Sequence, residues 1–140
     1  MDNKALIESF WKVVYERDWE RIASFFAPDG HYEDVPTPDS GATGPGNVVK
    51  RLKIGLEPIE RYEHELIRMV GDGDTVVTEH AETWYWHTGE SVRLPFVSVH
   101  VIADGKIKLW RDYWDMQTLI GAAPEWWIER LAKFSADDFS

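Results

Sequence analysis

The sequence predicts one α+β domain in which helices pack on one face of a curved, mostly antiparallel sheet. Three observations predict it: apolar residues at helical spacing near the N-terminus, strand-like segments between residues 62 and 114, and a second apolar helical stripe after residue 124. Helices followed by a run of strands are typical of this class. The 140 residues fit a single domain, residues 1–140, and their 44% hydrophobic content can supply its core.

The N-terminal segment predicts two helices from the spacing of its apolar residues. The apolar positions of the first helix are Leu6, Ile7, Phe10, Trp11 and Val14. Asp2 or Asn3 is placed to cap its start, and Asp18 interrupts the pattern. The pattern continues over residues 19–26 as a second short helix, which the Pro-Asp-Gly sequence at 28–30 should terminate.

The next segment predicts a short strand, a loop and a third helix. Residues 31–35 form a brief extended run, and residues 36–46, rich in Pro, Gly, Asp and Ser, form a loop. Pro45 suits the first turn of the helix, which Gly55 and Pro58 close. The apolar positions of that helix are Val48, Val49 and Leu52.

From residue 62 onward β-forming residues dominate. Four strands are predicted at residues 62–70, 75–86, 92–102 and 106–114. Short turn-forming sequences separate them, so we expect an antiparallel meander. A last helix is predicted over residues 124–134, and Asp137 and Asp138 should fray.

The strand at residues 92–102 is apolar on both faces. Leu94, Phe96 and Ile102 lie on one face, and Val97, Val99 and Val101 lie on the other. Helices can cover one face, whereas the other needs a partner sheet or a surface loop. We therefore expect a homodimer formed through the outer face of the sheet.

Composition excludes several classes of partner and chemistry. Fifteen Lys and Arg residues against 25 Asp and Glu give a net charge of -10, which repels nucleic acid and anionic membranes. Without cysteine there are no disulfides, no thiolate catalysis and no Cys-bearing zinc site. Neither a signal-like N-terminus nor a run of about 20 apolar residues is present. A cytoplasmic protein is the expectation.

Asp112 is the first candidate catalytic residue, because it stands among Trp110, Tyr113 and Trp114 on the last predicted strand. Burial among aromatic rings raises the pKa of a carboxyl group, which allows proton transfer near neutral pH. The alternative is that Asp112 only pairs with an arginine.

His80 and Glu82 fall on the same face of the second predicted strand. The two can form an acid–base pair in which the carboxylate fixes the tautomer of the ring. A cross-strand ion pair on the surface is the alternative. Trp84 and Trp114 are interpreted as substrate-binding walls because of their spacing from Glu82 and Asp112.

Tyr32 and Asp34 share one side of the short extended run before Pro36. They offer a phenol donor beside a carboxylate base. The alternative is that Asp34 is an Asx-type turn residue that opens the following loop.

No metal or cofactor site is predicted. Asp34, His80, Glu82 and Asp112 could together hold a divalent ion, but no predicted helix presents paired ligands at i and i+4. The glycines at residues 41–46 lack a following GK[ST], so no phosphate-binding loop is expected.

The segments TEHAETW, FVSVHV and DGKIKLWRDYWD, in this order, resemble the SnoaL-like branch of the nuclear transport factor two-like fold. The resemblance covers nearly the whole chain and implies a cone-shaped, cystatin-like α+β barrel, whose curved mixed sheet wraps around the N-terminal helices. The layout is similar to limonene epoxide hydrolases, where an arginine, two aspartates, a tyrosine and an asparagine surround one water. By this resemblance Asp112 is the C-terminal catalytic aspartate and Tyr32 the tyrosine.

Three positions depart from the hydrolase pattern. Its arginine falls on His80, its first aspartate on Glu82 and its asparagine on Asp34. Asp34 instead resembles the general-base aspartate of ketosteroid isomerases, which stands in a similar E-D-x-P context. The oxyanion-hole tyrosine and acid of those isomerases fall on Phe10 and Val97.

Residues and resemblance together predict a cofactor-independent lyase or isomerase that acts on a hydrophobic, aryl-bearing small molecule. Asp34 is expected to act as base, His80 as proton relay and Asp112 as acid or orienting group, with Glu82 holding His80. Epoxide hydrolysis of the limonene epoxide hydrolase type is the first alternative. Noncatalytic binding of a small molecule is the second, because a fold does not fix a function.

Overall fold

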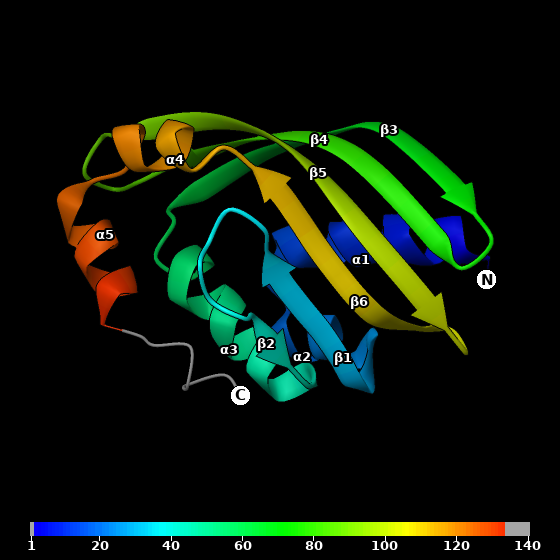
Figure 1. The fold of residues 1–140 in the computed structure, drawn as a ribbon. Coiled ribbons are helices and arrows are strands. Elements are labelled where there is room, and N and C mark those ends of the chain that lie inside the picture. The colour runs from blue at the N-terminus through cyan, green and yellow to red at the C-terminus, as the bar shows by residue number, and fades with distance from the viewer. Residues whose placement is uncertain (1, 134–140) are drawn as a thin grey trace.

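The computed structural model describes residues 2–133 of the 140 (Figure 1). Its helices are α1 (Asn3–Glu16), α2 (Trp19–Ser24), α3 (Pro45–Leu56), α4 (Met116–Ala122) and α5 (Glu125–Ala132). Its strands are β1 (Phe26–Asp34), β2 (Ala42–Thr43), β3 (Arg61–Asp72), β4 (Thr75–Tyr85), β5 (Ser91–Ala103) and β6 (Lys106–Trp114). None of the described helices is long and apolar enough to cross a membrane.

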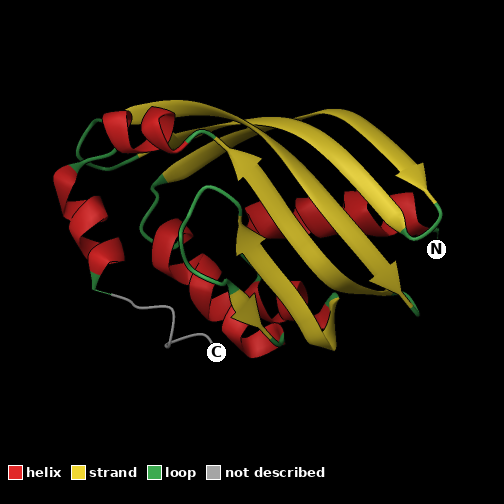
Figure 2. Cartoon of the chain, viewed as in Figure 1, coloured by secondary structure: helices red, strands yellow, loops and turns green. Residues whose placement is uncertain are grey.

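The strands form one curved six-stranded sheet with the order β2-β1-β6-β5-β4-β3. β3 to β6 pair with their neighbours antiparallel, which confirms the predicted meander, and β1 pairs with β6 in parallel. The sheet bends around the helices without closing on itself (Figure 2). The structure is therefore the predicted mixed α+β cone, with open edges at β2 and β3.

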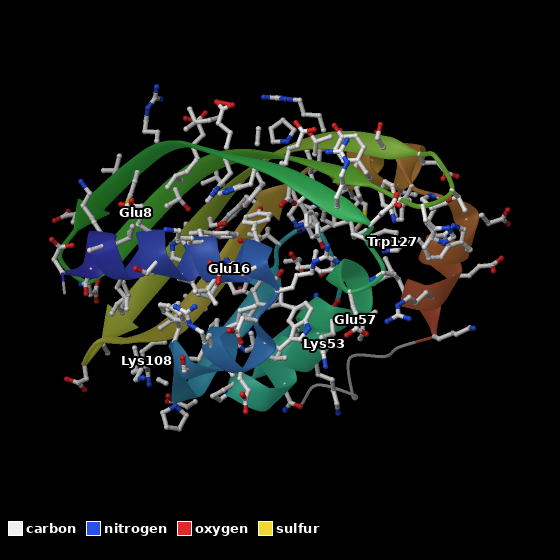
Figure 3. The ribbon with its side chains drawn as sticks, turned by 180° about the vertical axis from the view of Figure 1, so that it is seen from behind. Glu8, Glu16, Lys53, Glu57, Lys108 and Trp127 are labelled. Atoms are coloured by element: carbon white, nitrogen blue, oxygen red, sulfur yellow. The ribbon has the colours of Figure 1, made fainter. Side chains whose placement is uncertain are left out.

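Helix α1 lies across the concave face of the sheet (Figure 3). Its buried residues are Ile7, Phe10, Trp11, Val13 and Val14, which confirms the predicted apolar stripe. Asp2 caps its first turn by accepting a hydrogen bond from the backbone nitrogen of Ala5 at 2.7 Å. Arg17 ends it in the left-handed conformation with φ 55°, and Asp18 caps α2.

Strand β1 begins earlier than the sequence predicts. The second helix ends at Ser24, and Phe26 already pairs with Ile107 of β6. The register shifts between Phe26 and His31, so the Pro-Asp-Gly sequence bends a strand instead of ending a helix. Gly30 is required at this bend, because a Cβ there would lie 2.7 Å from the carbonyl oxygen of Ile107.

Two short elements are absent from the sequence prediction. β2 lies inside the predicted loop and pairs with β1, and α4, capped by Asp115, lies between β6 and the last helix. Pro45 does begin α3, and α5 confirms most of the last predicted helix. Asp137 and Asp138 lie outside the described residues.

Candidate active site

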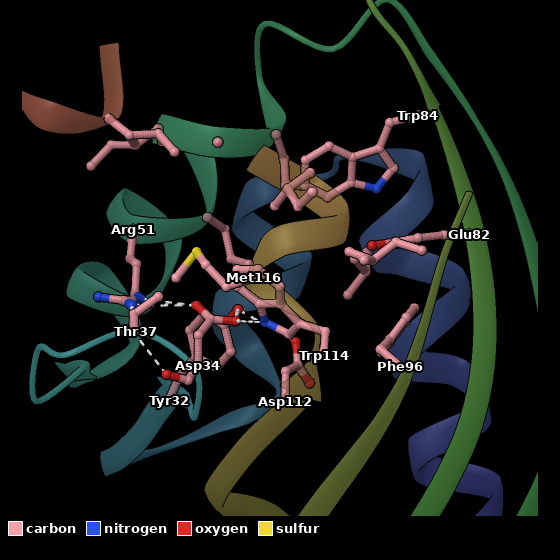
Figure 4. A pocket seen from close by; sticks show the side chains of 18 of the residues that line it. Tyr32, Asp34, Thr37, Arg51, Glu82, Trp84, Phe96, Asp112, Trp114 and Met116 are labelled. Atoms are coloured by element: carbon pink, nitrogen blue, oxygen red, sulfur yellow. Dashed lines mark hydrogen bonds and ion pairs between the residues drawn. The ribbon is translucent and has the colours of Figure 1, made fainter. Parts of the chain in front are cut away.

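A cavity of about 430 Å³ lies between the concave face of the sheet and the helices (Figure 4). Aromatic and aliphatic side chains form most of its wall, among them Trp84, Leu94, Phe96, Trp114, Leu119 and Trp127. Four carboxyl groups also line it, those of Asp34, Asp39, Glu82 and Asp112. A space of this size with apolar walls and a few polar groups suits a small hydrophobic molecule.

Asp34 stands at the end of β1, where the chain leaves the sheet. Its Oδ1 accepts hydrogen bonds from the Tyr32 hydroxyl at 2.9 Å and from Trp114 Nε1 at 3.0 Å. Its Oδ2 accepts from Arg51 Nε at 3.4 Å and Nη2 at 3.3 Å. The carbonyl oxygen of Asp34 accepts hydrogen bonds from the backbone nitrogen and the hydroxyl of Thr37, so Asp34 opens the loop through its main chain and not as the Asx-type turn residue of the alternative. Four donors thus hold this carboxyl group in one orientation.

Asp112 lies beside Asp34 on the neighbouring strand, because the parallel register of β1 and β6 pairs these two residues. Its Oδ1 accepts hydrogen bonds from Ser98 Oγ at 2.5 Å and Trp110 Nε1 at 2.6 Å. Burial, together with the charge of Asp34, raises the pKa of Asp112 well above its ordinary value. Among the described residues no arginine pairs with it, since Arg111 binds Glu33 instead. The alternative interpretation of Asp112 is therefore wrong.

The hydroxyl of Tyr32 links the two aspartates. It donates to Asp34 and lies 3.4 Å from Oδ2 of Asp112. Its ring stacks on Trp110 with centroids 3.9 Å apart, which fixes its direction. Burial and the charge of Asp34 raise the pKa of Tyr32 well above 10, so it keeps its proton as a donor.

Arg51 is a site residue that the sequence prediction omits. It projects from α3 and pairs with Asp34 at 3.3 Å and with Asp39 at 2.7 Å. The hydrogen bonds to Asp39 are the main cause that raises the pKa of Arg51, against the effect of its burial. A signal exists in the sequence: Arg51 follows Val48 by three residues and precedes Leu52, so it lies on the apolar face of the helix.

Glu82 enters the cavity from β4, away from the two aspartates. One of its oxygens accepts a hydrogen bond from the hydroxyl of Tyr15, which α1 supplies. Burial is the largest cause that raises the pKa of Glu82 to about 7. Tyr15 is a second omitted site residue, although its place four residues after Trp11 puts it on the buried stripe of α1.

His80 does not join these groups. Its side chain is fully buried, is not part of the cavity wall, and stacks on Phe96 with centroids 4.3 Å apart. Its ring nitrogens meet His64 Nε2 at 2.8 Å and Thr78 Oγ1 at 2.5 Å, and not Glu82. Burial lowers the pKa of His80 to about 3. The predicted pairing with Glu82 is wrong, because the cavity begins further along β4 than His80.

The two predicted tryptophan walls both line the cavity, Trp84 from β4 and Trp114 at the end of β6. Trp114 also donates to Asp34, so it orients the carboxylate as well as forming a wall. Within residues 2–133, no three His, Asp or Glu side chains are grouped so that they could hold a metal ion. Metal independence stays a prediction, and turnover that survives EDTA would support it.

Comparison with known proteins gives one family and a set of similar folds. A family model described as SnoaL-like domain matches residues 7–110. An LEH-like epoxide hydrolase from M. tuberculosis is 24% identical, with a TM-score of 0.71 over 84% of this chain and 86% of that chain. A candidate ketosteroid isomerase from Kribbella flavida is 22% identical, with a TM-score of 0.66 over 80% and 76%. A candidate SnoaL-like polyketide cyclase from Shewanella denitrificans is 16% identical, with a TM-score of 0.74 over 84% and 93%. These structures share the nuclear transport factor two-like fold with this chain.

Proposed function

Because the chain belongs to the SnoaL-like domain family, we propose that it is a cofactor-independent lyase or isomerase that acts on a hydrophobic, aryl-bearing small molecule. One observation carries the proposal: Asp34 and Asp112 line one aromatic cavity and touch the same Tyr32 hydroxyl. Their other partners differ, and different surroundings divide two like carboxyl groups into a base and an acid.

Asp34 is the base in this proposal. Arg51 lies against one of its oxygens, and Tyr32 and Trp114 donate to the other, so the carboxylate is held in one orientation. Its side chain keeps 16% of its surface exposed, which leaves it reachable from the cavity. A carboxylate so placed can remove a proton from an acidic carbon of the substrate.

Asp112 is the acid. Burial keeps its carboxyl group protonated, so it can give a proton to a leaving group in a lyase, or to carbon in an isomerase. The Tyr32 hydroxyl then restores the site: Asp34, now protonated, donates to the Tyr32 oxygen while Tyr32 passes its own proton to Asp112. Every proton is accounted for and no cofactor takes part.

The cavity wall supports an aryl substrate. Trp84, Phe96 and Trp127 offer flat apolar surfaces on which an aromatic ring can stack. With about 430 Å³ of space, the cavity suits a molecule of two or three rings.

Epoxide hydrolysis is the second candidate, and Arg51 favours it. That mechanism needs a charged acid that activates water, a protonated acid that opens the ring, and a permanent cation near them. Arg51 supplies the cation beside Asp34 from a different element than the hydrolase pattern, whose arginine falls on His80.

One labelling experiment separates these functions. Aryl ketones with acidic C–H bonds are incubated with the protein in D₂O, and aryl epoxides in H₂¹⁸O, and the products are analysed by mass spectrometry. We expect deuterium to enter the ketones and the epoxides to stay intact. A diol labelled with ¹⁸O would establish the hydrolase, and tight binding without exchange or hydrolysis would establish the binding protein.

Asp29→Asn is the matched control for Asp34→Asn. Asp29 lies on the same strand, is exposed, and pairs with Lys108 outside the cavity. Exchange should continue in the control and fall in Asp34→Asn. Equal exchange in both folded variants would contradict the role of Asp34.

A further inference from the structure

The cavity has a second polar end that the proton transfer above does not use. Glu82 reaches into it, and only one of its oxygens has a hydrogen-bond partner, Tyr15, among the described residues. No Lys, Arg or His of residues 2–133 forms an ion pair with it. A carboxyl group in apolar surroundings without a cation favours its neutral form, which is a hydrogen-bond donor.

Trp84, two residues further on the same strand, adds a buried donor. Its side chain is 6% exposed, and its Nε1 has no acceptor at full hydrogen-bond geometry in the described part of the chain, although it lies near enough to the Glu82 carboxyl group to lower the pKa of that group, against the larger effect of burial. Figure 4 shows this indole nitrogen on the side of the ring that faces Glu82. A buried donor without an acceptor is costly, so native sites that keep one have a reason for it.

The two ends of the cavity face each other. In Figure 4, Glu82 and Trp84 lie on one side, and Asp34 with Arg51 lies on the opposite side. A molecule bound between them would place different atoms at each end. Glu82 and Trp84 lie at one end, and the ion pair of Asp34 with Arg51 lies at the other.

We propose that Glu82 and Trp84 form an oxygen-binding subsite that takes the carbonyl oxygen of the substrate, with Tyr15 as the residue that positions Glu82. This inference rests on the proposed function and names its substrate class: an aryl ketone or enone with an acidic C–H bond beside the carbonyl. In this subsite the Glu82 carboxyl group and the indole nitrogen of Trp84 donate to the same oxygen.

The chemistry of such a substrate balances with these residues. Asp34 takes the proton from carbon, and the electron pair of the broken C–H bond forms a C=C bond. The π electrons of the carbonyl move to its oxygen, where Glu82 and Trp84 donate hydrogen bonds to the growing negative charge. Asp112 then gives its proton to carbon or to a departing group.

Two probes of nearly equal shape test the subsite without turnover. 2-Acetylnaphthalene carries the carbonyl oxygen, and 2-isopropenylnaphthalene replaces it with a CH₂ group. Calorimetric titration at pH 6 should show the ketone binding about threefold to tenfold more tightly, the range expected for one or two net hydrogen bonds. Equal binding of the two probes would overturn the proposal.

Variants assign the preference to residues. Glu82→Leu should abolish it and Trp84→Phe should reduce it, while Trp86→Phe should keep it. Trp86 is the matched control, since its Nε1 is also buried and has no acceptor among residues 2–133, but its side chain is not part of the cavity wall. A preference that survives in both Glu82→Leu and Trp84→Phe would overturn the proposal.

The pH dependence gives a second readout. The titratable groups that face Glu82 are Tyr15 from α1, Tyr62 from β3, Asp34 from β1 and Asp112 from β6. As pH rises through about 7, Glu82 loses its proton and can no longer donate, so the preference for the ketone should shrink. Glu82→Gln keeps an amide donor, so its preference should stay constant with pH. The same decline in Glu82→Gln would overturn the role of Glu82.

Asp34→Asn separates this inference from the proposed function. It should keep the preference for the ketone while losing deuterium exchange. Wild-type exchange in this variant with the preference intact would refute the proposed function alone. Loss of deuterium exchange in Asp34→Asn, together with equal binding of the two probes to the wild type and to every variant, would refute the subsite alone.

Discussion

Two buried polar clusters lie on the concave face of the sheet, and they differ in whether their side chains line the cavity. The carboxyl cluster, defined as Asp34, Glu82 and Asp112, lines the cavity. The histidine cluster, defined as His64, His80 and His100, lies outside the cavity wall, with Trp11 packed against all three rings. Both contain groups whose charged forms are disfavoured by burial.

Their hydrogen bonds show the consequence of this difference. His100 receives a hydrogen bond from Trp11 Nε1 at 3.0 Å and lies 2.8 Å from the carbonyl oxygen of Val76, so both of its nitrogens are satisfied in the neutral form. Within residues 2–133 the Glu82 side chain has one hydrogen-bond partner, Tyr15, and Asp34 remains partly exposed. Burial with full pairing gives a structural cluster, whereas burial with groups left open to a cavity gives a candidate site.

The largest expected effect is in the carboxyl cluster. Asp34→Asn and Asp112→Asn keep size and polarity but remove the titrating group, so turnover should fall ~10²–10⁴-fold. Steady-state kinetics on a substrate found by the labelling experiment measures kcat and KM separately. A rise of KM with unchanged kcat would assign these residues to binding alone.

His80→Gln tests the other cluster. It should lower the free energy of unfolding by about 1–3 kcal/mol, because His64 or Thr78 loses a buried partner. Turnover of the folded variant should change little, since His80 does not reach the cavity. Urea denaturation and kinetics on the same preparation check both, and a hundredfold loss of kcat would restore the proton-relay role that the sequence suggests.

Stability should respond to pH in opposite directions in the two clusters. Burial lowers the pKa of His80 to about 3, so the unfolded chain binds protons first, and stability falls as pH drops from about 6.5 toward 3. Burial raises the pKa of Glu82 to about 7, so the folded chain holds its proton longer, and stability falls as pH rises from about 4.5 to 7.

Urea denaturation at a series of pH values separates these contributions. Relative to the wild type, His80→Gln should flatten the acid side of the stability profile and Glu82→Gln the side above pH 4.5. Identical profiles for the wild type and both variants would mean that neither group is held in its neutral form by burial.

The smallest effect on chemistry is expected from the convex face. Val97 and Tyr113 are partners in the β5–β6 register and are 37% and 43% exposed, which leaves an apolar surface opposite both clusters. We propose that a second copy covers it, as the sequence predicts. Val97→Asp should then convert a dimer to a monomer in light scattering with turnover retained, and a monomeric wild type at micromolar concentration would refute the dimer.

Sequence periodicity predicted much of the fold because its signals are local. The stripe of α1 and the meander of β3 to β6 each follow from spacing within one segment. The parallel contact of β1 with β6 does not, because it joins residues almost eighty positions apart. The bend at Gly30 could not be predicted for the same reason, since the carbonyl oxygen that leaves no room for a Cβ there belongs to Ile107, far away in the sequence.

The candidate site was partly predictable for a related reason. Aromatic neighbours pointed to Asp112, and alternation placed Tyr32 and Asp34 on one side. The alternation of side chains along β4 also placed His80 on the same face as Glu82. It does not show at which residue of β4 the cover by α1 ends and the cavity begins. Arg51 comes from another element, and only the packed structure brings it to Asp34.

The parallel register of β1 and β6 has a consequence for how this protein could diverge. Asp34 and Asp112 are direct partners across two strands, so the spacing of their backbones follows the strand separation of about 4.8 Å. The wall is supplied largely by other elements, such as Leu119 on α4 and Trp127 on α5. The proposed acid and base thus lie on other elements than much of the wall. If the proposed roles hold, substitutions in α4 and α5 can change which molecule fits the cavity while the backbone spacing of Asp34 and Asp112 stays the same.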